Sequence, residues 1–584
     1  MYISSICIEN FRNFRKTEVK LQKKTILLGE NNSGKTNLML ALTLPLSTSD
    51  VGNFRKKLGW DDFNKECRED YVDFVNHNSV AITNGTLSKD DILPHIPTVI
   101  VTLTFVPEAN TDDIFYLKKL ISELTSDNGI FTLRYCYYLK NVEALLSWLR
   151  EVLTGEDYNE GIVHTLLPIE LYETEITNGS GDKAVSYTDL QNFSYSLIPA
   201  ERDDFSGNIR NIGSKLFVDM LTKKLGGSQK SSIEKGYNDF FDKIRNSAQV
   251  DDLINWQKYS SIENSREFFN DLELQPNIPN LYSVLNSARL GMKGRPLSGE
   301  GLGHRNLLFL AVLLNALSAP DKDTPNYTLL LIEEPDAHLS QSSQLILSSF
   351  LDTDQIQATK HLQVIFDTHS LNFINKQNLE NIVILSDGKA HSLGTLFNKK
   401  ELDYLSRNPN LDIYTFLFSK RVIMVEGLSE ELLLRAHIAS RTNQFNRTTI
   451  LSFHKGFKNA ISIWKDINTN SENKLAIIRD FDDQPNAKKE HEALDSDNVR
   501  SFTTTSYTLE TEILQTGANY ESLKTLFTDE LGWNDINDKK ALLEKWLEEK
   551  LTPMLTLCKA YSSGNLEKFE LPSHIKEALN WLGD

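Results

Sequence analysis

The segment Gly29–Thr36 has the residue spacing of a loop that binds phosphate. It reads Gly-Glu-Asn-Asn-Ser-Gly-Lys-Thr, which fits the pattern GxxxxGK[ST]. In such a loop, glycines let backbone N–H groups turn inward around the α- and β-phosphates of a nucleotide. Lys35 would reach the β- and γ-phosphates, and Thr36 would hold Mg²⁺. The residues that we expect to bind ATP in this segment are Asn32, Ser33, Gly34, Lys35 and Thr36.

An apolar run that ends in two acids supplies the second part of a nucleotide site. Leu329–Ile332 is followed by Glu333 and Glu334. The first acid would contact Mg²⁺ through water, and the second would polarise the attacking water. A later apolar run leads to His369, where a sensor of the γ-phosphate would lie. Each piece alone is also typical of a strand that simply leaves the core, so the prediction depends on the order of all the pieces.

A second set of acids occurs near the end of the chain. Glu426 follows the apolar run Val422–Val425, and Glu430 lies one turn into the helix expected after it. Asp480 and Asp482 follow the run Lys474–Ile478. The carboxyl ends of parallel strands meet at one edge of a sheet, so we expect these acids to lie together. Their hard oxygens suit one or two Mg²⁺ or Mn²⁺ ions, which could activate water and neutralise a scissile phosphate. For any single acid, a solvated strand end is the alternative. The acids are Glu426, Glu430, Asp480 and Asp482.

The elements that must position these residues are mostly alternating strands and helices. Residues from about 203 to 275 are different, because they are polar, helically spaced and poor in β-branched runs, which predicts a helical insertion. The last ~50 residues are expected to be mostly helical. The predicted strands are Ile3–Glu9, Thr17–Leu21, Thr25–Leu28, Thr98–Phe105, Thr328–Ile332, Leu362–Phe366, Ile382–Leu385, Val422–Val425 and Lys474–Ile478.

Composition restricts the class of protein. The 584 residues carry 62 Lys and Arg against 80 Asp and Glu, a net charge of −18, which disfavours a coat on nucleic acid but allows a local basic groove. The 4 cysteines form no CxxC pair, which argues against a zinc ribbon or a disulfide framework. The longest apolar run, Leu307–Leu317, is too short to span a bilayer, and no signal peptide is apparent. We therefore expect a cytoplasmic protein without membrane contact.

The order of the nucleotide motifs resembles that of ATP-binding-cassette ATPases of the SMC/RecF type. The opening segment Ile8–Phe14 is similar to their I-x-N-F-[RK]-x-F start. The resemblance implies that Leu297–Gly301 is a signature segment whose N–H groups bind the γ-phosphate of ATP held by a partner protomer. Its sequence departs from the transporter-like LSGGQ, so the contacting residues stay open among Ser298, Gly299, Gly301 and Gly303.

The run Val-Glu-Gly-Leu-Ser-Glu-Glu from Val425 resembles a Toprim domain, the metal-binding unit of topoisomerases, primases and nucleases. Placed after an ATPase of this type, it resembles the OLD (overcoming lysogenization defect) family of nucleases, as does the segment Ser196–Asp203. The resemblance implies the metal ligands Glu426, Glu430, Asp480, Asp482, Glu510 and Glu512, with Asp483 as a substitute for Asp482. It also implies a lysine that stabilises the transition state, for which Lys550 is the first candidate and Lys568 the second. The expected catalytic residues are Glu334, Glu426 and Lys550.

The expected fold class is α/β: an ABC-type (SMC/RecF-like) ATPase domain with a helical dimerisation insertion, followed by a Toprim α/β domain. The expected parts are residues 1–203 and 291–415 for the ATPase, 204–290 for the insertion, and 416–584 for the Toprim domain with C-terminal helices.

These observations predict an ATP-hydrolysing, divalent-metal-dependent DNA endonuclease in which ATP controls cleavage. The resemblance implies an anti-phage role, a homodimer or homotetramer, and in some systems a helicase or a reverse-transcriptase/RNA partner. Whether ATP activates or restrains cleavage stays open. One alternative is an SMC/RecF-like DNA-repair clamp whose Toprim domain does not cleave. Another is a topoisomerase or primase built on the same fold.

Overall fold

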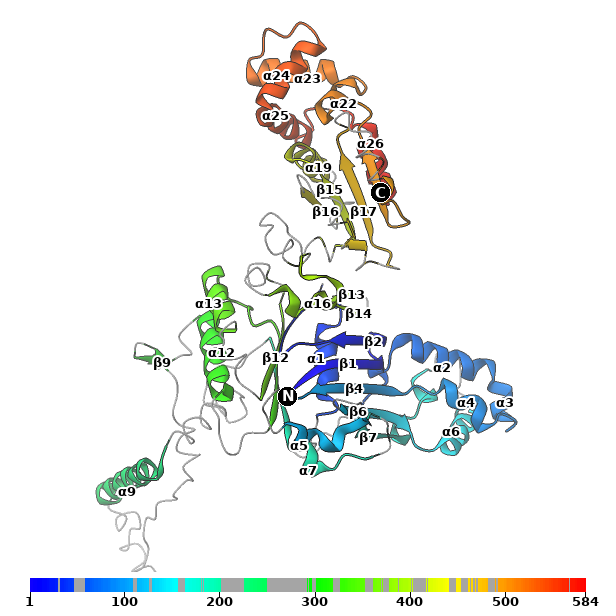
Figure 1. The fold of residues 1–584 in the computed structure, drawn as a ribbon, viewed down its shortest axis with the longest axis vertical. Helices are drawn as coiled ribbons and strands as arrows, with labels where there is room; N and C mark the ends of the chain where they lie inside the picture. Colours follow the sequence, from blue (N-terminus) through cyan, green and yellow to red (C-terminus); the bar gives the residue numbers. More distant parts are fainter. Residues whose placement is uncertain are drawn as a thin grey trace, which may run out of the picture.

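The fold is described from a computed structural model of the chain (Figure 1). The residues that the structure describes are 1–29, 32–46, 58–108, 113–124, 129–155, 163–179, 181, 183–200, 225–248, 291–292, 294–296, 301–318, 326–351, 361–368, 370, 378–386, 388–400, 402, 416, 419–440, 448–452, 461–462, 464–465, 468, 471–481, 489, 492–566 and 568–583.

The first sheet is antiparallel and has the strand order β2-β1-β4-β6-β5, with β7 also paired to β6. Alternate residues of β1 and β4 are buried, so one face of the sheet packs against the core. The strands are β1 (Tyr2–Phe11), β2 (Phe14–Lys20), β4 (Val99–Val106), β5 (Ile121–Leu124), β6 (Gly129–Leu139) and β7 (Tyr172–Asn178). The predictions for the first two strands and for Thr98–Phe105 are confirmed.

The second sheet has a parallel centre and the order β14-β13-β3-β12-β11-β8. Its central strands are buried on both faces, in keeping with their mostly apolar sequences. The strands are β3 (Lys24–Leu28), β8 (Phe193–Ile198), β11 (Tyr327–Ile332), β12 (Leu362–Asp367), β13 (Ile382–Ser386) and β14 (Lys389–Ser392). Three strands far apart in the sequence, β3, β12 and β11, therefore end side by side.

Alternate residues of the central strands belong to different cores. Leu27 and Leu329 join the core shared with the antiparallel sheet, whereas Ile26 and Leu330 join the core on the opposite face. The helices of this half are α1 (Lys35–Thr43), α2 (Lys65–His77), α3 (Ser79–Thr83), α4 (Lys89–Ile92), α5 (Asp113–Leu117), α6 (Val142–Thr154), α7 (Tyr187–Leu190), α9 (Gly227–Ala248), α12 (Leu302–Ser318), α13 (Gln341–Leu351) and α16 (Leu393–Leu396).

The C-terminal part forms a second α/β unit, coloured yellow to red in Figure 1. Its sheet is fully parallel with the order β16-β15-β17-β18, and the strands are β15 (Arg421–Val425), β16 (Thr448–Ser452), β17 (Lys474–Arg479) and β18 (Val499–Thr503). The helices are α19 (Leu428–Ser440), α22 (Leu509–Gln515), α23 (Asn519–Leu531), α24 (Lys539–Glu549), α25 (Leu551–Ser562) and α26 (Ser573–Leu582). The predicted strands Val422–Val425 and Lys474–Ile478 are confirmed, and so is the prediction that the last ~50 residues are mostly helical.

The predicted helical insertion falls largely outside the described residues. The part that is described, α9, is helical over 22 residues. A short hairpin, β9 (Gly291–Met292) with β10 (Arg295–Pro296), lies where the insertion is expected to end. The four cysteines form no disulfide, as predicted. Among the described residues, no helix combines the length and the apolar character needed to cross a bilayer.

Candidate nucleotide site and acidic cluster

The glycine-rich loop lies between β3 and α1, as its sequence predicts. Asn32 and Gly34 both have left-handed backbone conformations, with φ angles of 70° and 106°. A Cβ atom on Gly34 would lie 2.2 Å from Asn13 Nδ2, so only glycine fits there. Glu30 and Asn31 lie outside the described residues, and Thr36 is exposed at the start of α1.

Lys35 is held inside this loop. Its side chain is buried, with the residue only 6% exposed, and Nζ donates a hydrogen bond of 2.9 Å to the Gly29 carbonyl. Burial lowers the pKa of Lys35, while the charges of Asp367 and Glu334 act to raise it. The ammonium is therefore placed where it can reach a phosphate that the loop encloses.

The two acids after β11 differ in their backbone contacts. The Glu333 N–H donates 2.8 Å to the Ile198 carbonyl at the end of β8, which continues the parallel ladder. The Glu334 N–H instead donates 2.6 Å to Asp367 Oδ1 at the end of β12. Glu334 has a φ angle of 41°, a left-handed conformation that costs an ordinary residue about 1–2 kcal/mol. The contact to Asp367 helps to stabilise this conformation, which turns the chain out of the strand beside the loop.

The acids of the second unit come from three separate elements. Glu426 directly follows β15, Glu430 lies on α19, and Glu510 lies on α22. Glu430 is 4% exposed and Glu510 is 6% exposed. The pKa of Glu430 is raised to about 7, mainly by burial and also by the charges of Glu510 and Glu426, while backbone hydrogen bonds oppose the rise. The fold thus places Glu426 and Glu510 near enough to Glu430 for their charges to act on it, although over 80 residues of sequence separate the first of them from the last.

The other predicted ligands have different surroundings. Glu512 accepts hydrogen bonds from Thr505 Oγ1 (2.8 Å) and the Ser506 N–H (2.9 Å). Burial alone would raise the pKa of Glu512, but these hydrogen bonds outweigh it and lower the pKa. Glu512 therefore stabilises the loop that leads into α22. Asp480 follows β17 and is half-buried, whereas Asp482 and Asp483 lie outside the described residues.

The predicted transition-state lysine lies at the junction of α24 and α25. Lys550 is exposed there with a φ angle of 34°, and its N–H donates 2.7 Å to the Trp546 carbonyl. Lys568 is also exposed. Within the part of the chain that the structure describes, no three acidic, histidine or cysteine side chains are spaced to hold a metal ion together.

Comparison with known proteins identifies the first half of the chain. The family described as "AAA ATPase domain" matches residues 1–374, which include β1, the glycine-rich loop and both acids after β11. The chain belongs to the AAA ATPase domain family. Family membership therefore confirms the prediction that the chain is an ATPase that binds ATP. The match ends before the second α/β unit begins.

Similarity to two endonucleases extends further along the chain. Endonuclease GajA of Bacillus cereus strain VD045 is 23% identical over 439 residues, which cover 74% of this chain and 67% of that protein. Endonuclease GajA of Bacillus cereus strain HuB5-5 is 22% identical over 540 residues, which cover 78% of this chain and 73% of that protein. The DNA replication and repair protein RecF of Caldanaerobacter subterraneus is 28% identical over 182 residues, 27% of this chain and 50% of that protein.

Asp367 is a residue of the ATPase site that sequence reasoning missed. It is 3% exposed and lies at the end of β12, between the strands that lead to Lys35 and to Glu334. Burial raises the pKa of Asp367 to about 6, and the charge of Lys35 and the hydrogen bond from Glu334 oppose this rise. The available signal was an acid that ends a central parallel strand. It was overlooked because the same strand leads to His369, which lies outside the described residues.

The predicted signature segment is described in part. Ser298 and Gly299 lie outside the described residues. Gly301 is exposed, and no atom of the described part of the chain lies within 4 Å of where its Cβ would be. At Gly303, a Cβ would lie 2.5 Å from the His338 carbonyl oxygen. Asn306 Nδ2 donates 3.1 Å to the Ala337 carbonyl. The first turns of α12 therefore pack against the loop that follows Glu333 and Glu334 and are hydrogen-bonded to it.

Proposed function

We propose that this chain is an ATP-controlled, divalent-metal-dependent DNA endonuclease of the OLD type. The observation that carries the proposal is the carboxylate cluster of Glu426, Glu430 and Glu510 beside a fully parallel sheet, in a chain whose first half is an ATPase domain. The two relatives named as endonucleases span most of this chain and support the same conclusion.

The negative charge of the cluster favours a divalent cation. Glu430 is buried, and the charged groups that shift its pKa are two further carboxylates. Buried like charges are costly, and a bound cation would neutralise them. Mg²⁺ or Mn²⁺ would supply water activation and charge neutralisation at a scissile phosphate. Its proposed ligands come from Glu426, Glu430, Asp480, Asp482, Glu510 and Glu512.

In the ATPase half, the chain's own residues have distinct tasks. Lys35 and the loop N–H groups would bind the phosphates, and Thr36 and Glu333 would hold the Mg²⁺ that accompanies ATP. Glu334 would orient the attacking water, and His369 would contact the γ-phosphate.

The proposed arrangement of the chain follows from these tasks. Residues 1–203 and 291–415 would form the ATPase domain, 204–290 the dimerisation insertion, and 416–584 a Toprim domain in which Lys550 assists cleavage. Ser298, Gly299 and Gly301 would reach ATP on a partner protomer, so the site requires at least a dimer. An anti-phage role, with or without a helicase or reverse-transcriptase/RNA partner, would fit a nuclease restrained or released by ATP.

A plasmid-nicking series tests the nuclease. Supercoiled DNA is incubated with the full chain and Mg²⁺ or Mn²⁺, with ATP, with a non-hydrolysable analogue, and without nucleotide. We expect cleavage by the parent and by Glu431→Gln, and loss of cleavage in Glu426→Ala and Asp480→Ala. Glu431 is a matched control because it is next to Glu430 on α19 but pairs at 2.9 Å with Arg435. Cleavage by Glu426→Ala at the parental rate would refute the assignment.

An ATP-dependent DNA clamp with a non-cleaving second unit is the other candidate function. The match to RecF over 27% of this chain favours it, and so does the lack of a closed three-residue metal group among the described side chains. Saturating DNA binding without cleavage, under every metal and nucleotide condition of the same series, would establish the clamp.

A further inference from the structure

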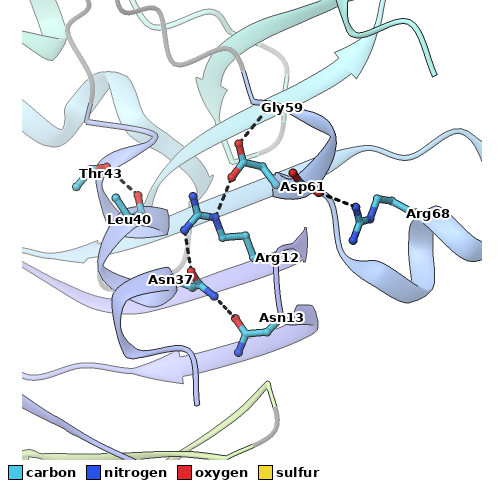
Figure 2. A network of polar contacts seen from close by, with 9 residues as sticks. Arg12, Asn13, Asn37, Leu40, Thr43, Gly59, Asp61 and Arg68 are labelled. Carbon is cyan, nitrogen blue, oxygen red and sulfur yellow. Dashed lines mark hydrogen bonds and ion pairs between the residues drawn. The ribbon is translucent and has the colours of Figure 1, made fainter. Parts of the chain in front are cut away.

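The turn between β1 and β2 makes a polar connection to the ATP loop. Figure 2 shows Arg12 and Asn13, from this turn, beside Asn37 of α1. Arg12 Nε donates a hydrogen bond of 2.8 Å to Asp62 Oδ1, and Arg12 Nη1 donates a hydrogen bond of 2.8 Å to Asn37 Oδ1. Asn37 Nδ2 then donates a hydrogen bond of 2.8 Å to Asn13 Oδ1, and Asn13 Nδ2 donates one of 3.1 Å to the Ser33 carbonyl.

The direction of this chain of hydrogen bonds is fixed at one end. A guanidinium can only donate, so Asn37 must turn its oxygen toward Arg12 and its amide nitrogen toward Asn13. The same constraint turns the oxygen of Asn13 toward Asn37 and leaves its nitrogen for Ser33. Each bond polarises the next, which strengthens the whole series.

The last link acts on the peptide that joins Ser33 to Gly34. This peptide is planar and trans, so the Gly34 N–H points opposite to the Ser33 carbonyl, away from Asn13. A carbonyl that accepts a hydrogen bond makes the N–H of its own peptide a better donor. Gly34 packs directly on the Asn13 amide, since a Cβ at Gly34 would lie 2.2 Å from Nδ2.

A second element packs on the outside of Asn13. At Gly388, in the turn between β13 and β14, a Cβ would lie 2.2 Å from the Asn13 carbonyl oxygen. The Gly388 carbonyl accepts a hydrogen bond of 2.7 Å from Thr17 Oγ1, which ties this turn to β2. Asn13 is thus held between the β13–β14 turn and the ATP loop.

We propose that Asn13 is a positioning residue of the ATP site. Its amide holds the Ser33 carbonyl outward and so keeps the Gly34 N–H directed toward the bound phosphates, while Asn37 and Arg12 fix the orientation of the amide. The proposal rests on the ATPase half and not on the proposed nuclease, because its readout is nucleotide binding. A failure of DNA cleavage leaves it untouched.

The test uses the full chain and four variants, titrated with Mg²⁺-ATP and Mg²⁺-ADP by calorimetry. Asn13→Ala removes the link, and Asn13→Asp places a carboxylate oxygen against the Ser33 carbonyl. Asn37→Asp keeps the acceptor for Arg12 but cannot donate to Asn13. The matched control is Asn78→Ala, which loses an equivalent amide-to-carbonyl bond of 2.8 Å to Phe74 at the end of α2.

Without this bond, the conformation with the Ser33 carbonyl turned outward should be about tenfold less populated, so the Kd of both nucleotides should rise about tenfold in Asn13→Ala and more in Asn13→Asp. Asn37→Asp should show a smaller increase in the same direction, and Asn78→Ala none. The KM for ATP should rise while kcat changes little. If Asn13→Ala fails to fold, Asn37→Asp decides. The proposal would be overturned if a folded Asn13→Asp or Asn37→Asp bound nucleotide with the affinity of the parent. It would also be overturned if Asn78→Ala lost as much nucleotide affinity as the Asn13 variants.

Discussion

The ATP site and the acidic cluster both collect buried charges beside a parallel sheet, but they balance those charges differently. In the ATP site, Lys35 lies among the acids, so that its charge opposes the rise in the pKa of Asp367. In the cluster, burial is the main cause that raises the pKa of Glu430 to about 7, and the charges of Glu510 and Glu426 contribute to the rise. The protein therefore supplies the counter-charge of the first site itself, whereas the proposed function requires a cation from outside to complete the second.

The largest expected effect comes from removing the internal counter-charge of the ATP site. Lys35→Ala should weaken ATP binding about 100-fold, since a charge-assisted hydrogen bond to a phosphate contributes up to about 3 kcal/mol. Calorimetric titration with ATP measures this effect, with the exposed Lys20→Ala as control. Mn²⁺ binding without nucleotide should be unaffected. If Lys35→Ala also lost Mn²⁺ binding, the charges of the two sites would not be balanced independently of each other.

Acid should destabilise the second unit through a buried histidine. His574 on α26 is 4% exposed, and neither ring nitrogen has a hydrogen-bond partner among the residues that the structure describes. Burial lowers its pKa to about 4, although the charge of Glu512 acts to raise it. Because the folded pKa is below that of the unfolded chain, His574 contributes stability at neutral pH that is lost as the pH falls from about 6.5 toward 4.

At pH 5.5 this loss should reach about 1.4 kcal/mol relative to pH 8. Urea unfolding of the parent and of His574→Leu at both pH values, followed by tryptophan fluorescence, measures it. The variant should be less sensitive to acid than the parent by that amount. Equal sensitivity in the two proteins would mean that His574 does not remain neutral in the folded state.

The smallest expected effect concerns the acid that sequence reasoning missed. Asp367→Asn keeps an oxygen that can accept from the Glu334 N–H but removes a negative charge beside Lys35. ATP titrated in the presence of a chelator should bind the variant a few-fold more tightly, because one like charge near the phosphates is gone. Weaker binding would show that Asp367 is needed in its ionised form to position Lys35.

Local patterns predicted most of the elements. The apolar runs around Thr25–Leu28, Thr328–Ile332 and Val422–Val425 are each bounded by turn or helix signals, and each is a buried strand in the structure. β8 was not predicted, although Phe-Ser-Tyr-Ser-Leu alternates apolar and polar residues as a half-buried strand does. It becomes a strand by pairing with β11 along six residues.

Contacts between distant segments could not be read from the sequence. Asn13 contacts Ser33 because the β1–β2 turn folds back over the loop, and no local pattern encodes that return. Glu510 was a candidate only by resemblance, and its position near Glu430 depends on how α22 packs in the core of the second unit. The role of Glu512 in stabilising its own loop likewise depends on the conformation of Thr505 and Ser506.

The most direct test of the central claim is a calorimetric titration of the nucleotide-free chain with Mn²⁺. Without ATP the phosphate loop has no anion to share with a metal, so the titration isolates the acidic cluster. We expect saturable binding by the parent and by Glu431→Gln, and a loss of affinity of about tenfold or more in Glu430→Gln, which lacks one charged ligand. Binding of Mn²⁺ by Glu430→Gln with parental affinity would contradict it.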